Sequence, residues 1–170
     1  SDAVYSDSNK PLTENSETNP DNLHGFMHLM RESILKSLNT KLCIIRPTLV
    51  YGSNDPHNSY GPNQFARRAQ SKKSIKLFGK GEERRDHINV KDVGFAIYSL
   101  LNKKYVGTVN IVTGQVYSFY QIANKIKKLY KVKVKYLKRN GPMPHRGYRA
   151  FNNSLIKKLL IKNNFINVLH

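Results

Sequence analysis

The sequence has a single cysteine, no tryptophan and no long apolar run. One cysteine, Cys43, excludes an internal disulfide and is typical of proteins of a reducing compartment. Because it lies in the apolar run 42–45, the sequence predicts a buried structural thiol and not a nucleophile. No apolar stretch approaches the ~18 residues of a membrane span, and no signal peptide is recognisable. We therefore expect a cytoplasmic protein with no membrane segment.

Acidic residues are scarce, and they are absent from the last part of the chain. The 170 residues include 29 Lys and Arg against 11 Asp and Glu, which gives a net charge of +18. All of the acids lie at or before Asp92, so the first 92 residues carry +3 and the last 78 carry +15. Such asymmetry is typical of proteins that bind nucleic acids or membranes. The simpler interpretation is a lysine-rich composition with solvated basic faces.

Strand and helix signals alternate along the chain. Its length allows a core that buries roughly 70% of the unfolded surface, and 39% hydrophobic residues argue against wholesale disorder. Polar loops are expected over 8–22 and 51–64. Apolar spacing and caps predict helices over 24–38, 65–70, 92–101 (capped by Asp92), 119–130 (capped by Ser118) and 153–161. Short apolar or alternating runs predict strands over 3–5, 42–46, 74–78, 87–90, 108–112 and 132–137, of which 42–46 should be buried on both faces. The alternation indicates an α/β fold.

Four short motifs occur in an order and spacing that is specific only in combination. They are SDAVY at 1–5, RPTLVYG at 46–52, FGKGEERRDHINVKDV at 78–93 and GTVNIVTG at 107–114. Together they resemble the extended short-chain dehydrogenase/reductase family, the NAD(P)-dependent epimerases and dehydratases that act mostly on nucleotide sugars.

The resemblance implies the C-terminal half of a doubly wound, Rossmann-type parallel sheet plus a small α/β substrate domain. It places residues 1–52 in the dinucleotide domain and 53–170 in the substrate-binding portion, with 87–112 partly returning to the Rossmann sheet. The family's glycine-rich loop, which holds the cofactor pyrophosphate at a helix N-terminus, does not occur in the 170 residues. We therefore expect a fragment that binds NAD or NADP poorly by itself.

The family's catalytic Tyr-x-x-x-Lys motif has histidine at both positions, His24 and His28. In the family the tyrosine exchanges the proton, and the lysine lowers its pKa and holds the nicotinamide ribose. The i, i+4 spacing still places both side chains on one helix face, and an imidazole pKa of about 6.5 suits proton transfer. The resemblance makes Ser1 the partner of the reacting sugar hydroxyl. Ser1, His24 and His28 are thus the candidate catalytic residues.

Two other interpretations of the histidine pair stay open. One is a site that binds without turnover. The other is a zinc site completed by Glu32 one turn further on, although the metalloprotease pattern needs Glu directly after the first His, where this chain has Gly25. We expect no metal.

The resemblance also names residues for substrate and cofactor. A guanidinium fork suits phosphate oxygens, so Arg85 is the candidate ligand of the nucleotide diphosphate, unless Arg84 and Arg85 are only a solvated basic pair. The other substrate candidates are Asn63, Arg146 and Arg149. His28, Pro47 and Val50 are the candidates for the cofactor.

The sequence therefore predicts a nucleotide-sugar epimerase or dehydratase that transfers a hydride transiently with NAD or NADP. An inactive nucleotide-sugar-binding relative is the first alternative. A basic nucleic-acid-binding module, with Tyr130 and Tyr136 among the lysines, is the second. It is disfavoured because Lys131, Lys133 and Lys135 alternate as on a solvated strand face. A homodimer through the helix 24–38 is the candidate assembly.

Overall fold

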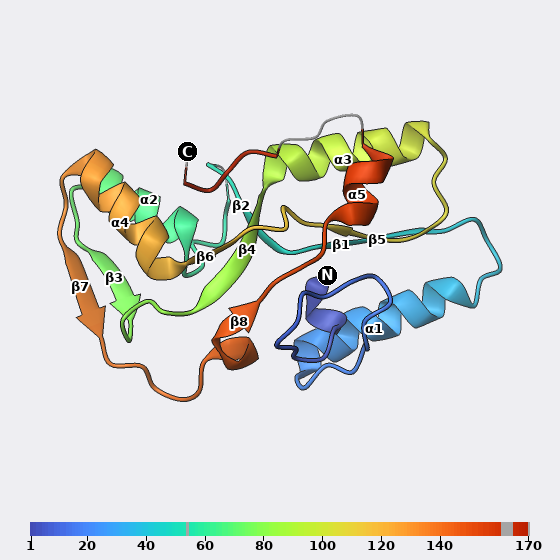
Figure 1. Cartoon of the computed structure of the whole chain (residues 1–170), viewed down its shortest axis with the longest axis horizontal. Coiled ribbons are helices and arrows are strands. Elements are labelled where there is room, and N and C mark those ends of the chain that lie inside the picture. Colours follow the sequence, from blue (N-terminus) through green and yellow to red (C-terminus); the bar gives the residue numbers. More distant parts are fainter. Residues whose placement is uncertain (54, 161–164, 170) are drawn as a thin grey trace.

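The structure, a computed structural model, describes residues 1–53, 55–160 and 165–169 (Figure 1). Its helices are η1 (Asp2–Val4), α1 (Leu23–Lys36), α2 (Pro62–Gln70), α3 (Val90–Asn102), α4 (Phe119–Tyr130), η2 (Pro144–Gly147) and α5 (Ser154–Leu159). Its strands are β1 (Cys43–Pro47), β2 (Leu49–Tyr51), β3 (Ile75–Phe78), β4 (Arg84–Asn89), β5 (Gly107–Ile111), β6 (Val116–Ser118), β7 (Val134–Leu137) and β8 (Tyr148–Arg149).

Most strand pairs are parallel. β1 pairs with β5, β2 with β4, β3 with β7 and β4 with β8, all in parallel. The one antiparallel pair among the described strands joins β4 to β6. Strands that pair in parallel need long crossovers between them, and helices supply these here. The α/β fold class predicted from the sequence is confirmed.

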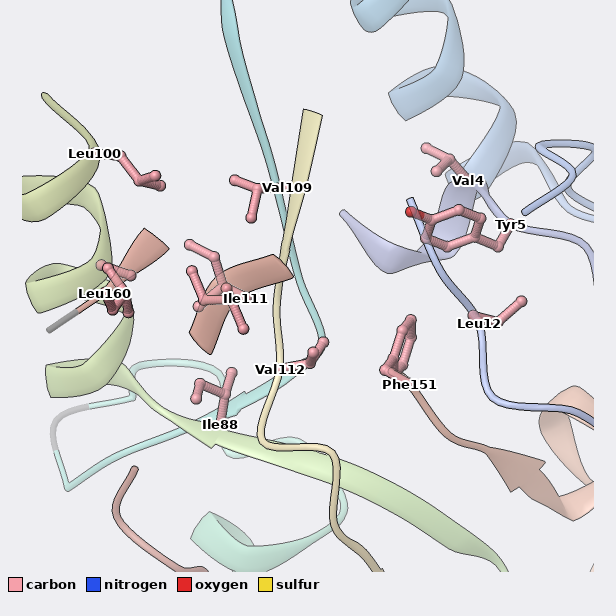
Figure 2. Close-up of a cluster of buried hydrophobic side chains, with 12 residues drawn as sticks. Val4, Tyr5, Leu12, Ile88, Leu100, Val109, Ile111, Val112, Phe151 and Leu160 are labelled. Carbon is pink, nitrogen blue, oxygen red and sulfur yellow. The ribbon is translucent and has the colours of Figure 1, made fainter. Parts of the chain in front are cut away.

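The first hydrophobic cluster surrounds the β1–β5 pair. Figure 2 shows Val4 and Phe151 on one side of these strands and Leu100 and Leu160 on the other. α1 and α3 lie on opposite sides of the same pair (Figure 1). The N-terminal segment therefore packs into this core.

The second hydrophobic cluster lies between the β3–β7 pair and the helices α2 and α4. Ile75 and Leu77 of β3 point into it with no exposed surface, whereas Lys76 between them is exposed. Lys133 and Lys135, beside and on β7, are exposed as predicted. Figure 1 shows this second unit at the end of the molecule away from α1.

The helix caps were predicted in part. Ser118 caps α4 as expected: its hydroxyl accepts from Gln121 N, and the Gln121 side chain accepts from Ser118 N. Asp92 does not cap α3, because Asn89 takes that position and accepts from Lys91 N. Asp92 is instead fully buried in the first turn and accepts a hydrogen bond from Ile166 N at 2.7 Å. Ile161, the predicted end of the last helix, lies outside the described residues.

Two strand predictions need correction. Residues 3–5 do not form a strand: η1 covers Asp2–Val4, with the Ser1 hydroxyl accepting from Ala3 N and Tyr5 N donating to Asp2 O. The 42–46 strand exists as β1, but it is not buried on both faces. Ile44 and Arg46 are buried, whereas Cys43 and Ile45 are only half-buried. Burial still raises the pKa of the Cys43 thiol. No described helix is both long and apolar enough to cross a membrane.

Candidate functional site

His24 and His28 lie in the first turns of α1, against which η1, the turn that follows Ser1, packs. The rings of His24 and His28 meet edge to face, with centroids 4.7 Å apart. The close approach of the two elements depends on Gly25, because a Cβ at this position would overlap the carbonyl oxygen of Ala3. Asn22 begins α1 by accepting a hydrogen bond from Gly25 N at 2.9 Å. The glycine between the histidines thus brings the Ser1 segment to them.

The protonation of His28 decides what this side chain can do. Burial, together with the neighbouring His24 and Arg31, lowers its pKa from the usual imidazole value. At neutral pH His28 is therefore uncharged and can donate or accept a hydrogen bond. It does not supply the fixed positive charge that a lysine would supply at the same position.

A buried polar network holds α1 against β1 beneath these residues. The guanidinium of Arg46 donates to both carboxylate oxygens of Glu32, at 2.9 and 2.6 Å. It also stacks over the ring of Tyr5, 4.7 Å from the centroid, and the Tyr5 hydroxyl donates to Asn110. Glu32 is therefore engaged in a buried ion pair. In the described part of the chain no three His, Cys, Asp or Glu side chains gather as a metal site.

The proposed cofactor residues Pro47 and Val50 flank a link to the N-terminal segment. The hydroxyl of Thr48, between them, donates to Asp2 Oδ2 at 3.5 Å and to Asp86 O at 3.2 Å. Val50 is 40% exposed and lines a cavity of about 410 Å³ after β2. These contacts place the end of β1 and the start of β2 beside the segment that carries Ser1.

Asn63 lines the same cavity, but its amide is engaged by the protein. Its oxygen accepts from Gly52 N at 3.0 Å, and its nitrogen donates to Asp55 at 2.9 Å. Arg67 also donates to the carbonyl of Asp55. Asn63 therefore holds together the two ends of the loop that borders the cavity.

Arg85 lies beside a second cavity, of about 540 Å³, and shares it with an arginine that sequence reasoning missed. Both Arg85 and Arg139 line this cavity and face the buried carboxylate of Glu83. Arg85 Nε donates to Glu83 at 2.8 Å, and Arg139 Nη1 lies 3.6 Å from the other oxygen. Among the described contacts, Nε and Nη2 of Arg139 are buried without a hydrogen-bond partner. One carboxylate thus orients two guanidinium groups at one hollow.

The position of Arg139 near Arg85 depends on the pairing of two strands that lie far apart in the sequence. Arg139 follows β7 by two residues, and the Phe78–Gly81 turn follows β3. Because the two strands are parallel, their carboxyl ends meet at the same edge of the sheet. Nothing local in the sequence pairs these strands, so the coincidence is visible only after folding.

The remaining predicted arginines differ from each other. Arg146 is exposed at a turn where it has φ +52. Arg149 is only 1% exposed, and its guanidinium donates to backbone carbonyls of the N-terminal segment. Arg149 lies next to Arg85 in the β4–β8 register. Arg149 therefore connects the segment that follows Ser1 with the strand that carries Arg85.

Two buried titratable groups lie side by side on β4. The carboxylate of Asp86 accepts from Thr113 N, Thr113 Oγ1 and Gly114 N at 3.1, 2.6 and 2.8 Å. Burial raises the pKa of Asp86 to about 6 in spite of these donors. Burial also lowers the pKa of His87 to about 4, and its ring packs against Phe119. Asp86 thus orders the turn after β5.

Comparison with known proteins identifies the family. Residues 1–112 match the NAD dependent epimerase/dehydratase family. The chain belongs to this family. A search of curated proteins finds no match. The sequence motifs therefore identified the family correctly.

Solved structures of similar fold include nucleotide-sugar enzymes. The NAD dependent NDP-hexosamine 5,6-dehydratase of tunicamycin biosynthesis has a TM-score of 0.85 and 18% identity over 99% of this chain and 57% of its own. UDP-glucuronic acid 4-epimerase from Bacillus cereus, in complex with UDP-glucuronic acid and NAD, has a TM-score of 0.84 and 19% identity over 98% and 55%. A protein of Pseudomonas aeruginosa complexed with NADPH has a TM-score of 0.80 and 19% identity over 98% and 60%. This epimerase/dehydratase chain thus spans somewhat more than half the length of these structures.

Proposed function

We propose that this chain is the substrate-side part of an NAD(P)-dependent nucleotide-sugar epimerase or dehydratase. The observation that carries the proposal is the pair Arg85 and Arg139, held by Glu83 at one cavity. Two guanidinium groups with N–H donors to spare suit the oxygens of a diphosphate. Residues 1–52 then belong to the dinucleotide domain and 53–170 to the substrate-binding portion. The pairing of β5, within 87–112, with β1 supports this division.

The residues at the other end of the proposed site have the chemistry for proton transfer. In the proposed reaction Ser1 hydrogen-bonds a sugar hydroxyl, and His24, exposed at the start of α1, takes or returns its proton. His28, kept neutral by burial, can hydrogen-bond a ribose hydroxyl. A nicotinamide cofactor, when bound, supplies the hydride acceptor. His28, Pro47 and Val50 would contact it.

A binding experiment tests the diphosphate site. UDP is titrated calorimetrically into the chain and into its Arg85→Gln, Arg139→Gln and Arg84→Gln variants. Loss of one charge-assisted hydrogen bond should weaken UDP binding by about tenfold or more in the first two variants. Arg84 is the matched control, because it lies next to Arg85 on β4 but packs over Tyr148. Equal loss in all three variants, or no binding by the folded chain, would contradict the proposal.

A nucleotide-sugar-binding relative without turnover is the second candidate. The histidines at both positions of the catalytic motif favour it, because His28 lacks the permanent charge of a lysine. In a protein that also contains the rest of the dinucleotide domain, a bound nucleotide sugar without turnover would identify this role. Turnover that falls sharply in His24→Phe would instead place His24 in the reaction.

We also propose α1 as the homodimer contact. Its exposed apolar side chains include Phe26 and Ile34, which are 53% and 58% exposed, and Leu38, just after the helix, is 60% exposed. Sedimentation of the chain, compared with Phe26→Ser and Ile34→Ser, tests this assignment: a monomer at all concentrations would exclude it for this chain.

A further inference from the structure

The side chain of Arg149 is turned into the protein and toward the N-terminal segment. Its guanidinium donates to the carbonyls of Asp2, Tyr5 and Ser6, the last two at 3.2 and 3.0 Å. The carboxylates of Asp2 and Asp7 lie 3.8 and 3.6 Å from its nitrogens. Three of its five N–H groups therefore bond within the chain, and Nε is buried without a hydrogen-bond partner among the residues that the structure describes. Because the side chain is 1% exposed, little of the guanidinium is open to a phosphate.

The stretch before Arg149 makes a second contact with the same segment. His145 Nδ1 lies 2.7 Å from Asp7 Oδ1. His145 and Arg146 both have positive φ, +51 and +52, which side chains other than glycine rarely adopt. Such a conformation persists where surrounding contacts hold it. The segment 144–149 thus holds residues 2–7 at two points.

These contacts connect the two ends of the proposed site. Arg149 is the register neighbour of Arg85, which lines the arginine cavity. The carbonyls that it binds belong to the segment that begins with Ser1 and packs on α1 at Gly25. A single buried side chain therefore joins the strand of Arg85 to the segment of Ser1.

We propose that Arg149 is a positioning residue, which sets the place of Ser1 relative to Arg85 and does not itself bind the substrate. The inference rests on the proposed function for its meaning, but its contacts can be tested without substrate. It also reverses the expectation from the family resemblance, in which Arg149 contacts the diphosphate.

The experiment compares Arg149→Gln and Arg149→Lys with Arg146→Gln, an exposed arginine of the same turn. The first measurement is amide hydrogen exchange at Tyr5 and Ser6, whose N–H groups bond to Asp2 O and Glu17 O. The second is the NMR signal of the His28 ring, which lies on α1, the helix against which η1 packs. The third is UDP affinity.

Arg149→Gln should speed exchange at these amides by about tenfold or more, because charge-assisted bonds to the carbonyls are lost. The His28 signal should shift, and the UDP affinity should stay within about twofold of wild type, since no phosphate contact is removed. Arg149→Lys should recover part of the protection, and Arg146→Gln should leave the amide exchange and the His28 signal unchanged.

Two further variants separate positioning from general stability. Ile156→Val removes a methylene from a fully buried side chain of α5. It should lower the free energy of unfolding without moving the His28 signal. If Arg149→Gln does not fold, Asp2→Asn and Asp7→Asn loosen the same contacts from the other side and should give the same exchange pattern.

Unchanged exchange and an unchanged His28 signal in these variants would overturn the proposal. So would a fall in UDP affinity in Arg149→Gln as large as in Arg85→Gln. If the chain does not bind UDP at all, the proposed function fails, while the exchange and NMR results still decide the role of Arg149.

Discussion

Gly25 of α1 faces the carbonyl oxygen of Ala3 at a distance that leaves no space for a side chain. A Cβ at this position would also lie 2.5 Å from the Cβ of Pro20. The contact brings Ser1 to the two histidines. It also makes a glycine necessary inside a helix, where glycine otherwise costs stability.

Gly25→Ala should therefore lower the free energy of unfolding in spite of the higher helix propensity of alanine. We expect a loss of about 1–3 kcal/mol from the overlap, measured by chemical denaturation. Gly94→Ala is the matched control, because nothing lies within 4 Å of a Cβ there. This variant should gain up to about 1 kcal/mol. Equal effects of the two substitutions would contradict the packing argument.

Removal of either partner of the Glu32–Arg46 pair should destabilise the fold strongly. The pair is buried, with 9% and 4% of the side chains exposed. Glu32→Ala or Arg46→Ala leaves a charge buried without its partner, at a cost of about 3–5 kcal/mol. The double variant Glu32→Leu/Arg46→Met should be less destabilised than either single variant, because no buried charge is left. A double variant as unstable as the sum of the single ones would disprove the coupling.

His87 should make the protein less stable in acid. Its pKa is about 4 when folded and about 6.5 when unfolded. The unfolded chain therefore binds the proton first, and stability falls as the pH drops from 6.5 to 4, by about 3 kcal/mol. His87→Phe removes this group. Relative to wild type, the stability of His87→Phe should therefore rise by that amount as the pH falls from 6.5 to 4. Unfolding curves at several pH values measure this difference. A constant difference would show that His87 does not titrate as proposed.

Asp86 should act in the opposite direction on nearly the same interval. Its folded pKa of about 6 lies above the usual aspartate value, so the folded state binds the proton first. Its contribution to stability is complete below pH 4 and is lost as the pH rises through 6, again by about 3 kcal/mol. As the pH falls, Asp86→Asn should therefore lose stability relative to wild type, because protonation of Asp86 no longer offsets the destabilising protonation of His87. A parallel pH profile for Asp86→Asn and wild type would argue against the raised pKa.

Local signals in the sequence determined much of the secondary structure. The apolar spacing of α1, the Ser118 cap of α4 and the alternating lysines of β7 each depend on neighbours in the chain, and each was predicted. η1 was mistaken for a strand, because the sequence SDAVY has strand propensity while the hydroxyl of Ser1 and the packing on Gly25 favour a helical turn. Asp92 was mistaken for a cap for a similar reason: a carboxylate near a helix start has several partners available, and only folding selects Ile166 N.

The sequence by itself determined the family, the α/β class and the two histidines of the catalytic motif, since these depend on residue types and spacing. The tertiary structure alone decided which arginines can meet a diphosphate. Arg139 meets Arg85 because β3 and β7 are parallel, so the residues after β7 lie beside the turn that leads from β3 to β4. Arg149 turns inward because the carbonyls of Asp2, Tyr5 and Ser6 accept its hydrogen bonds. The scarcity of acids after Asp92 also affects the charge of the cavity that Arg85 and Arg139 line. Arg85 and Arg139 both form ion pairs with the carboxylate of Glu83, so the three groups together carry a positive charge that suits an anionic ligand.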